Sequence, residues 1–181
     1  MATQTAFPNG EGTNTGFTAS AGTKPDCVAV ANGDTDYVFR QTSAGAQSFT
    51  FPAFALGSVT AVNSVAMKVN SKAHAGAMTF RHRLRVNGTV YQGAVTSAPA
   101  SYTETSECWL TNPNTGAAWT QADAEGTGAA PLQQMDVGGM GGITAGEEFR
   151  ITQCCLVCDY TPAAAAPTAR LGGLVGGAMA S

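Results

Sequence analysis

Apolar and polar residues alternate along several short runs of the chain, and turn residues separate these runs. The clearest run spans residues 78–86, where the apolar positions are Met78, Phe80, His82, Leu84 and Val86. Successive side chains of a strand point to opposite faces, so this pattern predicts a strand with one face in a core and one in solvent. The Asn87-Gly88 pair that follows predicts a β-hairpin, with residues 89–92 as the returning strand.

Further strands are predicted at residues 36–40, 47–51, 65–69 and 148–160. One short helix is predicted at residues 120–125, because Thr120 can cap its first turn and Gly126 can end it. Many short strands and at most one short helix are typical of an all-β antiparallel β-sandwich or jelly roll. We therefore expect that fold class, with extended N- and C-terminal arms.

Large apolar residues and charged residues are both scarce. Charged residues make up 12% of the 181 residues, about half of the roughly 25% found in ordinary globular domains. Gly, Ala and Thr are densest at the two ends. We therefore expect an N-terminal extended arm over residues 1–25, a sandwich domain over 26–161 and a Pro/Ala/Gly-rich tail over 162–181. Ordering such arms costs conformational entropy, which packing against neighbouring molecules would offset.

Charge and hydropathy exclude several classes of partner. The net charge is −3 and the isoelectric point is about 5.2, which argues against a nucleic-acid binder. The sequence contains no apolar run of about 18 residues, so no membrane-spanning helix is predicted. The first ten residues lack the cationic and apolar regions of a secretory signal. We expect neither a nucleic acid nor a membrane as a partner.

One segment resembles a known group of proteins. The sequence WLTNPNTGAAWT at residues 109–120 resembles a segment common in tailed-bacteriophage virion proteins. FPNGEG at 7–12, DTDY at 34–37 and RITQ at 150–153 occur in the same order as in those proteins, so the resemblance covers most of residues 7–161. The chain resembles the small β-sandwich structural proteins that phages use as head decoration (cement) proteins, or on tails and fibres. The cysteine-rich last strand and the Ala/Gly tail depart from that pattern.

The resemblance implies a phage capsid decoration protein that binds the outer head surface and stabilises the shell. It would be made in the host cytoplasm and reside on the capsid surface of the virion, with the major capsid protein as its partner. A homotrimer is the implied oligomer, because capsid lattices present sites of matching symmetry. Two alternatives remain open: a phage tail or fibre component, and a carbohydrate-binding module that recognises a host surface.

The candidate partner interface combines one strand face with the tail. The outward positions of residues 78–86 include Arg81, Arg83 and Arg85, and arginine forms bidentate pairs with the carboxylates of an acidic partner. The alternative is a solvated outer face that discourages edge pairing. The apolar candidates in the tail are Leu171, Leu174, Val175 and Met179.

Trp109 and Trp119 bracket a strong turn signal at residues 112–116. The preferred interpretation is that both tryptophans anchor this loop to the core, because the chain has few other large side chains. A paired aromatic platform for a carbohydrate is the alternative.

No catalytic residue, cofactor or metal site is predicted. The Cys155 and Cys158 pair lacks the second pair of ligands that zinc needs, so the five cysteines are expected to be reduced and structural. His82 lies at an apolar strand position, and no nucleophile motif accompanies it.

Two segments, one acidic and one glycine-rich, have some features of ligand sites. Asp34 and Asp36, near Asn32, have the oxygen ligands that Ca²⁺ prefers, but the full loop pattern is missing and Asx-type turns are expected instead. The glycine-rich residues 138–142 lack a phosphate-loop lysine, so a flexible or tightly turned loop is expected.

Overall fold

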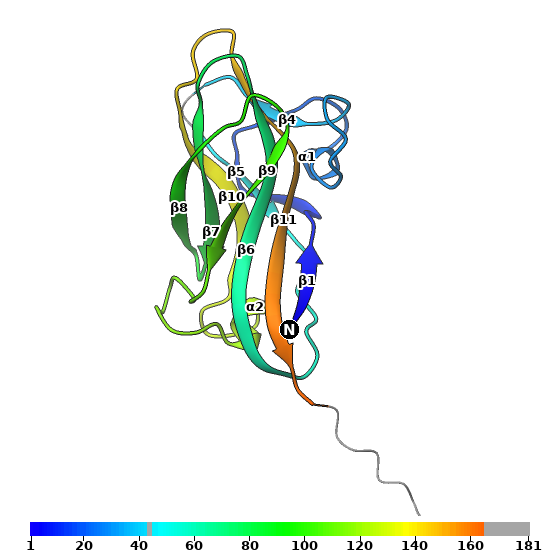
Figure 1. Cartoon of the computed structure of the whole chain (residues 1–181), viewed down its shortest axis with the longest axis vertical. Helices are drawn as coiled ribbons and strands as arrows, with labels where there is room; N and C mark the ends of the chain where they lie inside the picture. Colours follow the sequence, from blue (N-terminus) through cyan, green and yellow to red (C-terminus); the bar gives the residue numbers. More distant parts are fainter. Residues whose placement is uncertain (43–44, 165–181) are drawn as a thin grey trace, which may run out of the picture.

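The computed structural model describes residues 1–42 and 45–164. Two antiparallel sheets pack against each other (Figure 1). Sheet A contains β1 (Ala2–Ala6), β3 (Thr18–Ala19), β4 (Val38–Arg40), β6 (Val59–His74), β9 (Thr103–Trp109) and β11 (Glu148–Pro162). Sheet B contains β2 (Gly10–Thr15), β5 (Gln47–Thr50), β7 (Thr79–Val86), β8 (Thr89–Ser97) and β10 (Leu132–Gly141). The predicted all-β antiparallel sandwich is confirmed.

The alternating pattern of residues 78–86 gives β7 one core face. Phe80, His82, Leu84 and Val86 are buried there, and the intervening arginines are only partly exposed. Phe80 reaches across the core to Phe149 of β11, with ring centroids 4.8 Å apart. At the predicted hairpin, Asn87 and Gly88 both take positive φ, as a two-residue type I′ turn between β7 and β8 requires.

β6 and β11 form the longest strand pair of the sandwich. Their antiparallel register extends from Glu148 opposite His74 to Pro162 opposite Val59, along most of the length of the molecule (Figure 1). β4 and β1 pair with β11, β9 pairs with β6, and β3 pairs with β4.

The N-terminal segment differs from the expected separate arm. Residues 1–25 are largely extended, but they supply β1 and β3 to sheet A and β2 to sheet B. Their residues are mostly small and polar, so backbone pairing and polar contacts hold them rather than an apolar stripe. Sequence alternation gave no signal for these strands, which is why the sandwich begins earlier than expected.

The structure describes two short helices rather than at most one. α2 (Gln121–Ala124) is the predicted helix, and Thr120 Oγ1 accepts a hydrogen bond of 3.0 Å from the Asp123 amide as its cap. α1 (Lys24–Cys27) was not predicted. Its second residue is Pro25, which suits the first turn of a helix because a proline there loses no intrahelical hydrogen bond.

The glycines at residues 138–142 also differ from the expected loop, because β10 continues through Gly141. A Cβ atom at Gly138 would lie 2.2 Å from Arg83 Nη1, so the glycine makes room for an arginine of the neighbouring strand. A glycine-rich strand is therefore needed where long side chains cross it.

Only the first residues of the expected tail are described. Pro162 ends β11, and the tail candidates Leu171, Leu174, Val175 and Met179 lie outside the described residues. Within the described part of the chain, no helix has the length and apolar character needed to cross a membrane.

A buried carboxylate connects the N-terminal segment to sheet B. Asp136 of β10 is fully buried and lies 3.0 Å from Arg83 Nε. Its other oxygen accepts hydrogen bonds of 2.6 Å from the Ser48 hydroxyl and from the side-chain Nδ2 of Asn14. Because a buried charge is costly unless it is paired and hydrogen-bonded, these contacts hold β2, β5 and β7 around one point.

Replacing Asp136 with alanine should destabilise the sandwich strongly. The change leaves the Arg83 charge without its carboxylate, and breaking a buried pair in this way costs about 3–5 kcal/mol of unfolding free energy. Urea denaturation measures this loss. Glu104→Ala is the matched control, because its ion pair with Lys68 is exposed and such pairs contribute about 0–1 kcal/mol. Equal effects of the two substitutions would contradict this role for Asp136.

Candidate functional site

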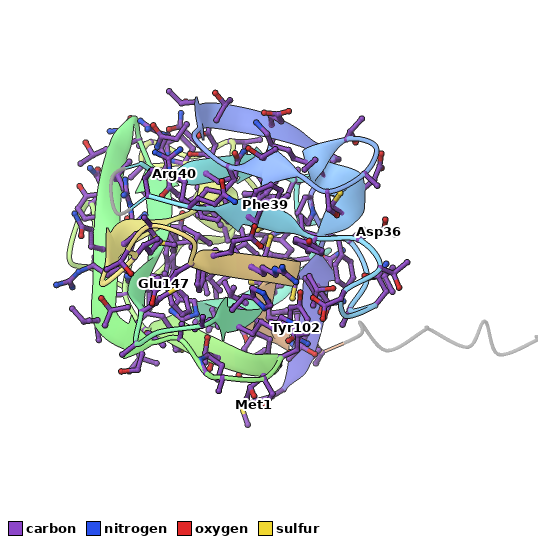
Figure 2. The ribbon with its side chains drawn as sticks, turned by 90° about the horizontal axis from the view of Figure 1, so that it is seen from above. Met1, Asp36, Phe39, Arg40, Tyr102 and Glu147 are labelled. Atoms are coloured by element: carbon purple, nitrogen blue, oxygen red, sulfur yellow. The ribbon has the colours of Figure 1, made fainter. Side chains whose placement is uncertain are left out.

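A face that combines aromatic and charged side chains lies where β4, β11 and β6 adjoin. The strand register places Phe39, Arg150 and Lys72 opposite one another across the three strands. Tyr37 precedes β4, and Tyr102 precedes β9. Figure 2 shows the molecule from above, with Phe39, Arg40 and Tyr102 labelled.

Asp34 is the centre of the polar contacts on this face. Its carboxylate accepts hydrogen bonds from Lys72 Nζ at 2.5 Å, from Arg150 Nη1 at 2.8 Å and from the Tyr102 hydroxyl at 3.1 Å. Arg150 also pairs with Glu148 at 2.7 Å. The two cations therefore link two carboxylates into one continuous ion-pair chain.

This chain favours the ionised form of its two carboxylates. The hydrogen bond from Lys72 lowers the pKa of Asp34 to about 2, with Arg150 and Tyr102 adding to the effect. Burial acts to raise the pKa of Glu148, but the hydrogen bonds from Arg150 and Gln41 outweigh it and the net shift is downward. Burial and the Asp34 contact both raise the pKa of Tyr102. A general acid or base works best with a pKa near the operating pH, and the pKa shifts of Asp34, Glu148 and Tyr102 all lead away from neutrality.

The aromatic rings of this face are held by the same cations. The Arg150 guanidinium lies 4.5 Å from the centre of the Tyr37 ring, and Lys72 Nζ lies 4.6 Å from that of Tyr102. The Tyr37 and Phe39 rings are tilted, with centroids 5.9 Å apart. Cation–π contacts of this kind fix both the ring and the charge.

A pocket of about 150 Å³ lies beside Phe39 at the edge of this face. It is lined by Gly16, Thr18, Phe39, Arg40, Gln41 and Thr42. Arg40 donates a hydrogen bond to the Gly16 carbonyl, and Gln41 Nε2 donates to Glu148 Oε1 at 2.9 Å. The residues that line the pocket therefore include one phenylalanine, two threonines, one glutamine and one arginine, and the hydrogen bond from Gln41 to Glu148 connects the pocket to the ion-pair chain.

The acidic residues weighed as a Ca²⁺ site have other partners. Lys72 and Arg150 balance the charge of Asp34, and Asp36 accepts a hydrogen bond of 3.0 Å from Asn32. Across residues 1–42 and 45–164, no group of three or more His, Cys, Asp or Glu side chains could hold a metal ion.

The cysteines are free thiols, and four of the five are buried. Burial raises the pKa of Cys155 to about 11 and that of Cys158 to about 12, and it raises the pKa of Cys154 as well. The thiolate is the nucleophilic form, so these three residues are poor nucleophiles near neutral pH. Cys108, on the edge strand β9, is exposed.

The three candidate interface arginines lie on β7 of sheet B, and none of them lines the pocket. Arg81 Nη1 donates to the Gly93 carbonyl and Arg85 Nη1 to the Gly88 carbonyl, both at 2.7 Å. Arg83 is paired with Asp136. Each guanidinium thus has a partner within its own chain, and a docking role for these residues stays a prediction.

The tryptophans that carry the phage-like motif contact each other. Trp119 is 3% exposed, and its indole Nε1 donates to the Trp109 carbonyl at 3.0 Å. Trp109 is partly buried against the core. Between them, the fully buried Asn112 donates to the Ala130 carbonyl and accepts from the Asn114 amide. A sugar platform needs exposed ring faces, which Trp119 lacks, so this motif serves to fold the loop.

Replacing Asn112 with alanine should therefore lower the unfolding free energy. The Ala130 carbonyl and the Asn114 amide would lose their partners, and an unsatisfied buried group costs about 1–3 kcal/mol. Urea denaturation provides the measurement. Leu110→Ala, a change at a 71% exposed position of the same segment, serves as control and should stay within about 0.5 kcal/mol of the parent. An unchanged stability of Asn112→Ala would refute the structural role of the motif.

His82 is a buried histidine between the two sheets. Its Nε2 atom lies 3.3 Å from the Thr105 carbonyl oxygen and 3.2 Å from the Thr105 hydroxyl of edge strand β9. Its Nδ1 atom is buried and has no hydrogen-bond partner among the described residues. Burial lowers the pKa of His82, although the Thr105 carbonyl and the charge of Glu107 oppose the shift.

This burial predicts an acid-sensitive stability. The unfolded chain, whose histidine pKa is about 6.5, binds more protons than the folded chain between the two pKa values. The unfolding free energy should therefore fall as the pH drops from 7 to 5, by at most about 1.4 kcal/mol per pH unit. Urea denaturation across this range should show the slope in the parent and a flatter profile in His82→Gln. The same slope in both proteins would contradict the assignment.

The face on β4, β11 and β6 escaped prediction from the sequence. Its residues come from four separate segments, and only the strand register brings them together. One signal was present: in the predicted strand at residues 36–40, a buried Val38 places Tyr37 and Phe39 on the outward side. These two outward aromatic residues are the part of the face that the strand pattern could indicate.

Comparison with known proteins gives few similarities. No protein-family model matches the chain, and no curated protein matches its sequence. The C-terminal CBM6 of LamC, a marine laminarinase from Zobellia galactanivorans, is 10% identical with a TM-score of 0.48, covering 87% of this chain and 100% of that one. The CBM22-1 xylan-binding domain of Paenibacillus barcinonensis Xyn10C is 12% identical with a TM-score of 0.38, covering 89% and 95%.

Proposed function

We propose that the chain is a non-catalytic binding module whose pocket beside Phe39 takes one sugar residue of a glycan. The observation that carries this proposal is the pocket lining, in which one phenylalanine adjoins two threonines, a glutamine and an arginine. A pyranose ring presents an apolar C–H face and a rim of hydroxyl groups. The aromatic ring suits the first and the polar side chains suit the second.

The surroundings of the pocket support binding without chemistry. The ion-pair chain through Asp34, Arg150 and Glu148 holds its charges near neutral pH and ends on Gln41 at the pocket. Side chains that are already held in place lose little further freedom when a ligand arrives, which favours affinity. The pKa values of Asp34 and Glu148 are lowered and that of Tyr102 is raised, so none of the three is shifted towards pH 7.

Replacing Phe39 with alanine should abolish or strongly weaken glycan binding. Burying an aromatic side chain contributes about 1.5–3 kcal/mol, so the affinity should fall at least about tenfold. A glycan array probed with the full chain identifies ligands, and calorimetry on the best of them measures the loss. Phe39→Tyr should retain binding, because it keeps the ring.

The matched control is Phe7→Ala, which removes a phenylalanine that is 40% exposed but outside the pocket. It should bind as the parent does. Failure of the folded parent to bind any glycan, or equal binding by Phe39→Ala, would refute the proposal.

A second candidate function rests on the sequence resemblance over residues 7–161: a decoration protein on a phage capsid, with the major capsid protein as partner and a homotrimer as oligomer. The two functions are compatible, since a protein on a virion surface can also bind glycans. Cryo-electron microscopy of virions that carry the chain tests the second candidate. Density at the threefold positions of the head supports decoration, and density on the tail supports a tail or fibre component. Absence from the particle refutes both of these virion roles.

A further inference from the structure

We infer that Gln41 presents a fixed hydrogen-bond acceptor at the pocket, so that the sugar group bound beside it must donate an O–H. This inference rests on the proposed sugar site and specifies which chemistry that site selects. It assigns Gln41 to contact with the ligand and Glu148 to positioning Gln41.

The orientation of the Gln41 carboxamide follows from its partner. A carboxamide has a donor end and an acceptor end, and either can face a neighbour that both donates and accepts. An ionised carboxylate only accepts, so Glu148 admits only the NH₂ end, which lies 2.9 Å from Glu148 Oε1. Among the described residues, none donates a hydrogen bond to Gln41 Oε1. That oxygen is therefore the end available to a ligand.

The carboxylate of Glu148 is itself held in place. Arg150 directs Nε and Nη2 to Glu148 Oε2, both at 2.7 Å, which leaves Oε1 for Gln41. Arg150 is fixed in turn by Asp34 at 2.8 Å and by the Tyr37 ring at 4.5 Å. These contacts also favour the ionised form of Glu148, whose net pKa shift is downward. Arg150 and Gln41 therefore both donate to Glu148, because the ionised carboxylate can only accept hydrogen bonds.

The consequence for specificity is a preference for a donor. A sugar hydroxyl can donate and accept, whereas a fluorine at the same position cannot donate and only weakly accepts. A site that presents a fixed acceptor must therefore discriminate against the fluorinated sugar. Leaving a polar group of the site unpaired is the step that costs affinity.

The test compares the parent with Glu148→Gln. A neutral carboxamide at residue 148 both donates and accepts, which frees Gln41 to turn its NH₂ end towards the ligand. Glu104→Gln is the matched control, because it also removes one carboxylate from sheet A but at the exposed pair with Lys68. All three proteins are used as full chains, with thermal unfolding to verify that each is folded.

The first readout needs no ligand. In the parent and in Glu104→Gln, the side-chain amide signals of Gln41 in ¹⁵N nuclear magnetic resonance spectra should shift on acid titration, with an apparent pKa below that of an ordinary glutamate. Glu148→Gln should abolish this titration. Gln41 signals that do not respond to acid in the parent would overturn the inference.

The second readout uses the methyl glycosides of glucose, galactose and mannose, each also with single hydroxyls replaced by fluorine. In the parent and in Glu104→Gln, one fluorinated position should weaken binding at least about tenfold, and in Glu148→Gln the same position should weaken it no more than about twofold. An equal fluorine penalty in all three proteins overturns the inference and leaves the sugar site standing. Failure of every methyl glycoside and every array glycan to bind the parent overturns both.

Discussion

The antiparallel pair of β6 and β11 is the constraint on which the rest of the sandwich depends. Every other strand of sheet A pairs with one of these two or with β4, which itself pairs with β11. The alternation of side chains along β11 places Phe149 in the core and its neighbours Glu148 and Arg150 at the site. A slip of one residue in this register would exchange the core face and the site face, so the same pairing sets both the fold and the candidate site.

The chain has few charged residues, and the structure shows how they are paired. Many of the charged side chains form ion pairs within the chain. Arg83 pairs with Asp136 in sheet B, and Lys72 and Arg150 pair with Asp34 beside sheet A. Glycine complements them, because a Cβ atom at Gly138 would collide with the Arg83 guanidinium. The few charges therefore order strands and side chains.

The sequence predicted the parts of the fold in which apolar residues alternate, such as residues 78–86 with their hairpin. It missed β1 and β2, whose small polar residues carry no periodic signal and are placed by backbone pairing with β11 and β5. It assigned the glycines of β10 to a loop, because the need for space beside Arg83 arises only between strands. The site was missed for a related reason: Phe39, Lys72 and Arg150 meet only through the register of three strands.

The location of a bound sugar tests the central claim most directly. The full chain, labelled with ¹⁵N, would be titrated with the glycan that binds it most tightly, and the shifted backbone amides mapped onto the sandwich. We predict that the largest shifts fall on Thr18, Phe39 and Gln41 at the pocket, while Trp109 and the amides of β7 and β8 stay unchanged. Shifts centred on the tryptophan loop or on the arginines of β7, with none at Phe39, would contradict the claim.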